Sequence, residues 1–216
     1  MKITKPRYRA PFLLLVQLLL IISSAFWSEI HREILTIAIP LLMALSGVAL
    51  SRSRRWLITY LALTSSSLIA AHLGDHWMLG VIRLFCHLGT FYMLFREVVQ
   101  HSFFRAGVPH ADRILAGMAG YLLLGLFWFV QFIATTTIQP NAILDQLTQQ
   151  SPDQANLLYF SFVTLTTLGY GDLVPVTAFA KMLVLLTTLS GVLYLAIFIA
   201  ALMSGAHSSK SNNLLD

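Results

Sequence analysis

The sequence predicts an all-α membrane protein with six transmembrane helices and one shorter, re-entrant helix. Of its 216 residues, 57% are hydrophobic and 11% are charged, and the mean hydropathy is +0.75. A soluble domain carries about 45–50% apolar and about 25% charged residues. Six apolar runs are each long enough to cross a hydrocarbon core of ~30 Å. They lie at residues 11–27, 34–50, 56–74, 77–95, 113–137 and 177–203.

The charges between these runs alternate in sign and predict the orientation of the spans. Basic residues gather before the first run, between the second and third, and between the fourth and fifth. Cytoplasmic loops of membrane proteins carry the excess of Lys and Arg. Both termini are therefore expected to be cytoplasmic, because 11 of the 14 Lys and Arg then lie on that side. This explains the net charge of +5 without a nucleic-acid partner.

The first apolar run leaves one alternative open. Residues 2–9 are basic, Phe12 to Ile22 is apolar and Ser23 to Ala25 is small, which is the pattern of a cleaved signal peptide. Phe26 and Trp27 follow directly. Bulky aromatic residues at this point favour an interfacial anchor on a retained span.

The segment 138–176, between the last two runs, differs from a simple span. It begins with a polar stretch, Gln139 to Gln150, that is unsuited to lipid. Ser151 to Gln154 then matches an N-cap serine, a proline at the first helical position, an acid in the first turn and a capping-box partner. This predicts a helix over Pro152 to Thr164, about 20 Å long, which is too short to span but suits a re-entrant helix.

After this helix, Gly169 and Gly171 flank Tyr170. Glycine adopts left-handed backbone easily, and irregular backbone at membrane depth is tolerated where it lines a cavity. Residues 159–175, Y-F-S-F-V-T-L-T-T-L-G-Y-G-D-L-V-P, resemble the pore loop of the potassium channel family. The match is specific because its core, T-T-L-G-Y-G-D, follows a short capped helix between two full spans and lies in an outward-facing loop.

The resemblance implies a tetrameric pore made by four identical chains, in which backbone carbonyls replace the hydration shell of K+. Potassium would bind at the carbonyls of residues 167–170 and at the Thr167 hydroxyl, with no other cofactor; membrane lipids are the remaining expected partners. Leu168 stands where the family usually has Val or Ile. The expected filter residues are Thr167, Leu168, Gly169, Tyr170 and Gly171.

The expected supports of this filter depart from the family pattern. Many members have two tryptophans on the pore helix, where this chain has Tyr159 and Phe160. Phe160 has no donor for Tyr170, whereas Tyr159 is able to bond Asp172, so we expect packing to hold the filter more than an aromatic hydrogen-bonded cuff does. The supporting residues are Tyr159, Phe160, Val163, Thr166 and Asp172. The acids expected at the outer mouth are Asp145, Asp153 and Asp172, with solvated loop acids as the alternative for the first two.

The last span carries the expected gate. Gly191 lies twenty residues after Gly171 and matches the family's hinge glycine, with close helix packing as the alternative. Leu195, Ile199 and Met203 recur every four residues. Four such stripes would form a hydrophobic constriction that closes by dewetting, unless the stripe faces lipid or another helix.

The first half, residues 1–97, resembles a four-helix voltage-sensor domain in span count alone. Between residues 77 and 95 the one permanent charge is Arg83, so weak or absent voltage dependence is expected. The further expected divisions are a linker over 98–112, a pore domain over 113–207 and a short cytoplasmic tail over 208–216. His72, Asp75 and His76 share a helix face that suits Zn²⁺ or external pH sensing, with a polar interfacial turn as the alternative.

The predicted function is passive K+ conduction through a channel in a cell membrane, by analogy the bacterial inner membrane. The alternatives are an accessory or regulatory channel subunit and a weakly selective cation channel. No metal triad, nucleophile elbow or phosphate loop points to an enzyme. A separate regulatory protein is not identified by the sequence, and neither is the gating stimulus.

Overall fold

The computed structural model describes residues 110–212 as one continuous segment, together with pieces of the first half of the chain. These pieces are residues 18, 58, 59, 61–63, 65, 66, 85, 86, 88, 89, 91–93, 95 and 96. The first four predicted spans fall mostly outside the described residues, as do Arg83 and nearly all of the linker over 98–112. They remain predictions.

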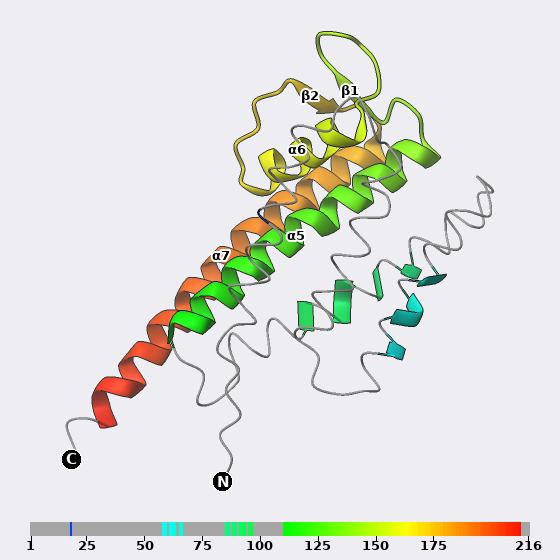
Figure 1. Ribbon diagram of the computed structural model, residues 1–216. Coiled ribbons are helices and arrows are strands. Elements are labelled where there is room, and N and C mark those ends of the chain that lie inside the picture. Colours follow the sequence, from blue (N-terminus) through cyan, green and yellow to red (C-terminus); the bar gives the residue numbers. More distant parts are fainter. Residues whose placement is uncertain are drawn as a thin grey trace.

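Two long helices run side by side, and a short helix packs beside one end of the pair (Figure 1). The helix α5 begins at the end of the pair where α7 finishes, so the connection that holds α6 lies at the opposite end (Figure 1). The elements, in chain order, are α5 His110–Ile138, β1 Ile143–Asp145, α6 Gln154–Leu165, β2 Leu173–Pro175 and α7 Ala178–Asn212.

Among the described residues, two helical segments are long and apolar enough to cross a membrane, Ala111–Ile138 and Ala178–Met203. They agree with the fifth and sixth predicted spans, 113–137 and 177–203. The helix α7 continues to Asn212, beyond the predicted boundary. Hydropathy marks where a helix would leave lipid and not where its hydrogen bonding stops, and no proline interrupts this segment.

A small two-stranded sheet corrects the all-α expectation. The strands β1 and β2 pair antiparallel, with Ile143 opposite Pro175, Leu144 opposite Val174 and Asp145 opposite Leu173. Strands of three residues are too short to show a period in the sequence. The sheet joins the connection before α6 to the chain just before α7, so both ends of the intervening segment are held together.

The core lies mainly between α5 and α6. Leu123, Leu126, Phe129 and Phe132 of α5 are almost fully buried. A Cβ at Gly125 would overlap the ring of Phe162, so the glycine lets α6 approach α5 closely. In the most apolar 18-residue stretch of each long helix, 61% of α5 and 22% of α7 is buried within the chain. The helix α7 therefore leaves most of its surface uncovered by its own chain.

Candidate functional site: the short helix and the segment after it

The N-terminus of α6 is capped by Asp153. This residue is extended, with φ −72° and ψ 177°, and its carboxylate accepts the N–H of Asn156 at 2.8 Å. The predicted N-cap, Ser151, is wrong, because its hydroxyl accepts the Asn141 N–H at 3.0 Å and donates to Asn141 Oδ1 at 3.1 Å. Pro152 accordingly precedes the cap and is not the first helical residue.

The C-terminus of α6 closes with two hydrogen bonds that reach back into the helix. The N–H of Thr167 bonds the Thr164 carbonyl at 3.0 Å, and the N–H of Leu168 bonds the Val163 carbonyl at 2.9 Å. This is the Schellman arrangement, whose left-handed position is usually glycine. Here Thr167 occupies it, with φ +62°. For an L-residue this conformation costs about 1–2 kcal/mol, and a β-branched side chain makes it exceptional.

In the segment that follows, the sign of φ alternates from residue to residue. Gly169 has φ +54° and Gly171 has φ +82°, which confirms the left-handed conformations expected of the two glycines. With Thr167, every second residue has a positive φ, whereas Leu168 and Tyr170 between them do not. The sequence does not predict the strained threonine, because a left-handed position is normally expected at glycine. Strain of this kind clusters at functional sites.

Within one chain, each residue from Thr166 to Asp172 is exposed. Leu168 is 55% exposed and Tyr170 is 67% exposed. Large apolar and aromatic side chains that gather on a surface indicate contact with another molecule. The segment is thus shaped by its own hydrogen bonds but is not covered by its own chain.

The Tyr159 hydroxyl donates to Asp172 Oδ2 at 2.8 Å, which is the hydrogen bond that the sequence led us to expect. This bond to the carboxylate is the main reason that the pKa of Tyr159 rises to about 12, with partial desolvation adding to it. The other carboxylate oxygen, Oδ1, accepts the N–H of Leu173 at 3.0 Å. Asp172 therefore connects α6 to the start of β2.

The remaining expected supports lie on α6 or at its end. Phe160 is buried, and its ring lies 5.0 Å from that of Phe132 on α5. Val163 is also buried. The Thr166 hydroxyl donates to the Phe162 carbonyl at 2.7 Å. These residues support the end of α6, and their influence on a filter remains a prediction.

The last carbonyl of α6 meets both long helices. The Tyr121 hydroxyl of α5 donates to the Leu165 carbonyl at 3.3 Å, and a Cβ at Gly191 of α7 would overlap that same carbonyl oxygen. We call Tyr121, Leu165 and Gly191 the helix-base contact. Close packing, the alternative role expected of Gly191, is what the structure shows at this position. Its role as a hinge remains a prediction.

The predicted gate stripe is exposed within the chain. Leu195, Ile199 and Met203 are 42%, 58% and 62% exposed. Tyr194 and Phe198, which directly precede the first two of them, are buried. The Tyr194 hydroxyl donates to the Gly117 carbonyl of α5 at 2.7 Å. Exposure suits each of the expected roles, so pore lining remains a prediction.

Two of the acids expected at the outer mouth accept hydrogen bonds from nearby backbone N–H groups. Asp145 Oδ1 accepts the N–H groups of Leu147 at 2.7 Å and Thr148 at 3.0 Å, and these bonds lower the pKa of Asp145. Asp153 caps α6. Both acids have a structural role, whatever they contribute to an outer mouth.

No group of three or more His, Cys, Asp and Glu side chains placed to hold a metal ion occurs among the residues that the structure describes. The predicted Zn²⁺ or pH site at His72, Asp75 and His76 lies outside those residues. It remains a prediction.

Residues 126–205 match a family model described as an ion channel. This range contains the second part of α5, all of α6, the exposed segment and most of α7. With the two apolar helices, it indicates a membrane protein. An ion channel family is not a class of enzymes.

Three curated proteins are similar to the chain. Two-pore potassium channel 4 of Arabidopsis thaliana is 40% identical over 58 residues, which is 27% of this chain and 20% of that protein. Two pore potassium channel b of Oryza sativa subsp. japonica is 34% identical over 85 residues, which is 39% of this chain and 24% of that protein. Two pore potassium channel a of the same rice is 31% identical over 81 residues, covering 37% and 23%.

The chain thus spans about a fifth to a quarter of the length of these relatives. No solved structure is significantly similar to the chain. The matches support the predicted potassium channel family. The six-span, voltage-gated-like architecture and the bacterial type remain predictions.

Proposed function

We propose that the protein is a potassium-selective channel of four identical chains, which conducts K+ passively across a cell membrane with little or no voltage dependence. The observation that carries this proposal is the alternating sign of φ at Thr167, Gly169 and Gly171, within the motif T-T-L-G-Y-G-D. Where the sign of φ alternates along a segment, like backbone groups point to one side. The alternation therefore suits a row of carbonyls directed at a cation.

A dehydrated K+ needs oxygen ligands that replace its lost water. In the proposed filter these are the carbonyls of residues 167–170 and the Thr167 hydroxyl. The strain at Thr167 supports this role, because a left-handed glycine would relieve the strain but would lack the hydroxyl. The proposal thus explains why a costly residue stands at this position.

The pore helix, α6, adds an electrostatic contribution. The C-terminal end of a helix carries about half a negative charge and favours a cation. The proposed filter begins directly after the C-cap of α6, Thr166. Four such ends would offset part of the dehydration energy of an ion in the central cavity.

The exposure of residues 166–172 supports assembly into a tetramer. A single strand of carbonyls cannot surround an ion, whereas four identical strands around a fourfold axis can. The apolar Leu168, the aromatic Tyr170 and the largely uncovered surface of α7 would then contact neighbouring chains.

Gating is the least constrained part of the proposal. A constriction at Leu195, Ile199 and Met203 would close the inner end of the pore by dewetting. Weak voltage dependence rests on the single permanent charge, Arg83, between residues 77 and 95. Both termini are placed on the cytoplasmic side by the positive-inside rule.

The test is K+ and Na+ flux from proteoliposomes that contain only the full chain, with valinomycin as the control for K+ loading. We expect K+ flux to exceed Na+ flux at least about tenfold, and to vanish in the double variant Thr167→Ala/Tyr170→Ala. Equal fluxes would contradict selectivity and indicate a weakly selective cation channel.

Absent flux is resolved by two further measurements. The mass of the protein in detergent should be about 96 kDa (4 × 24.1 kDa). Ile199→Asn should wet and open a hydrophobic constriction. A tetramer that conducts after this change supports a closed channel, whereas a monomer or a chain that stays silent indicates an accessory subunit. Gly191 is unsuitable for this purpose because it packs against α6.

A further inference from the structure

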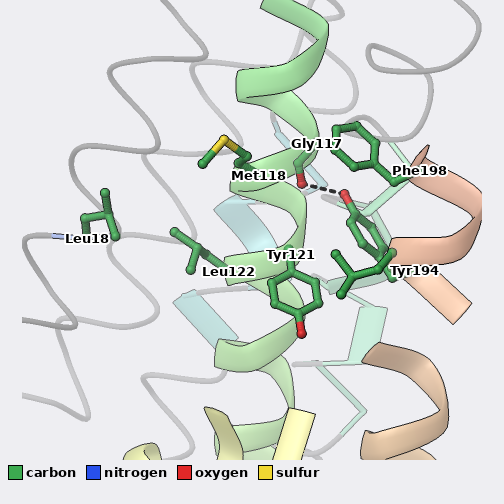
Figure 2. A pocket seen from close by; sticks show the side chains of 8 residues that line it. Leu18, Gly117, Met118, Tyr121, Leu122, Tyr194 and Phe198 are labelled. Atoms are coloured by element: carbon green, nitrogen blue, oxygen red, sulfur yellow. Dashed lines mark hydrogen bonds between the residues drawn. The ribbon is translucent and has the colours of Figure 1, made fainter. Parts of the chain in front are cut away.

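A half-open cavity of about 190 Å³ lies beside α5 and α7 (Figure 2). Leu18, from the first predicted span, and Gly117 contribute to its wall. The other lining residues are Met118, Tyr121, Leu122, Tyr194, Leu195 and Phe198.

The polar side chains of this lining are its two tyrosines. Each tyrosine hydroxyl donates a hydrogen bond to a backbone carbonyl. The Tyr194 hydroxyl bonds the Gly117 carbonyl at 2.7 Å, as Figure 2 shows, and the Tyr121 hydroxyl bonds the Leu165 carbonyl at 3.3 Å. The hydroxyl of Tyr121 points away from Leu122 and Met118 (Figure 2). A buried water needs two to four polar partners, and a cavity without them stays dry.

The volume sets the size of an occupant. An engineered cavity of about 150 Å³ lined by Leu, Ile and Phe binds benzene or xenon, and the present cavity is somewhat larger. A lipid tail extends over roughly half of a ~30 Å hydrocarbon core, which is much longer than this cavity. We propose that the cavity is a binding site for a small, freely diffusing apolar molecule of about the size of benzene.

The walls of this site reach the functional part of the molecule. Tyr121 belongs to both the cavity and the helix-base contact, and Leu195 belongs to both the cavity and the predicted gate stripe. An occupant therefore stabilises one spacing of α5 and α7 and, through it, one position of the base of α6. Its effect on flux rests on the proposed function, whereas the binding itself does not.

The test uses the full chain in proteoliposomes and the apolar photoprobe 3-trifluoromethyl-3-phenyldiazirine. After illumination, labelled peptides are mapped by mass spectrometry, with and without excess benzene. We expect a saturable, benzene-sensitive fraction of the label on the cavity residues of α5 and α7. Leu122→Trp fills the cavity and should abolish that fraction, whereas Leu115→Trp adds the same bulk to α5 outside the cavity and should preserve it.

Labelling that rises linearly with probe concentration would overturn the proposal, because it would show that lipid tails or neighbouring side chains fill the cavity. A saturable fraction that survives in Leu122→Trp would overturn it as well. Leu122→Phe is the milder variant if the tryptophan prevents folding, and it should weaken the saturable fraction. Saturable labelling of a chain that carries no K+ flux even as the Ile199→Asn variant would contradict the proposed function alone. K+ flux without saturable labelling would contradict this inference alone.

Discussion

The helix α6 and the segment directly after it contrast in how they are held. Leu157, Leu158 and Leu165 of α6 are at most 2% exposed, because α5 and α7 cover them. Every residue from 166 to 172 is exposed within the chain. One chain thus suffices to position the helix but leaves the segment without a partner surface. The contrast is what a site completed by several chains requires.

The two regions also differ in strain. Three of the residues from 167 to 171 have a positive φ, and one of them is a threonine. Such conformations persist only when the surroundings enforce them. Within the chain, the enforcement comes from the two ends of the segment: the hydrogen bonds that close α6, and the link from Tyr159 through Asp172 to β2.

The largest effect is expected at the base of the buried helix. An Ala for Gly exchange normally stabilises a helix by about 1 kcal/mol. In Gly191→Ala the new methyl group overlaps the Leu165 carbonyl, so we expect a loss of about 2 kcal/mol. Denaturant unfolding in detergent measures it. As the control, Ala196→Val adds bulk on an exposed part of α7 and should leave the unfolding free energy nearly unchanged. Equal losses of unfolding free energy in the two variants would contradict the helix-base contact.

A smaller effect, of the opposite sign, is expected in the strained segment. Thr167→Gly relieves a left-handed threonine and should raise the unfolding free energy by about 0.5–1 kcal/mol, after allowance for the flexibility of glycine. Gly169→Ala should lower it by about 1 kcal/mol, although a Cβ there meets no other atom. Both variants should lose K+ selectivity. A stability loss in Thr167→Gly would show that the threonine is not strained.

Tyr159→Phe removes the hydrogen bond to Asp172 and should change the unfolding free energy by less than about 1 kcal/mol. Because the bond holds the far end of the segment, we expect K+ flux to decay faster with time. The raised pKa keeps the phenol protonated, so the bond is present at neutral pH and its donor is lost only as the pH rises through about 12. Wild-type flux that decays with a midpoint below about pH 10 would argue against this support.

The smallest effect is expected at Asp145. Its lowered pKa means that its charge, and the stability that it adds, are present above the ordinary pKa of 3.8 and disappear as the pH falls below it. Asp145→Asn keeps an oxygen for the Leu147 and Thr148 N–H groups but removes the charge. K+ flux should fall less than about twofold at low salt and not at all at high salt. A salt-independent fall would indicate a structural effect.

Much of the structure from α5 to α7 could be predicted from the sequence. The expected helix over 152–164 differs from α6, Gln154–Leu165, by two residues at most, and the expected Tyr159–Asp172 bond is present. These features depend on residues close together in the chain. The identity of the N-cap could not be predicted in this way, since Ser and Asp are both good N-cap residues. Asp153 caps the helix because the Ser151 hydroxyl is hydrogen-bonded to Asn141, which lies ten residues earlier in the chain.

The sequence by itself determined the membrane character, the two long helices α5 and α7 and the glycines that turn left-handed, because composition and backbone preference are local. Only the tertiary structure decided that Thr167 shares their strained conformation, that Gly191 touches the base of α6, and that α5 and α7 line a half-open apolar cavity. These features depend on how closely separate helices approach. That distance is set by packing over the whole fold and leaves no local pattern in the chain.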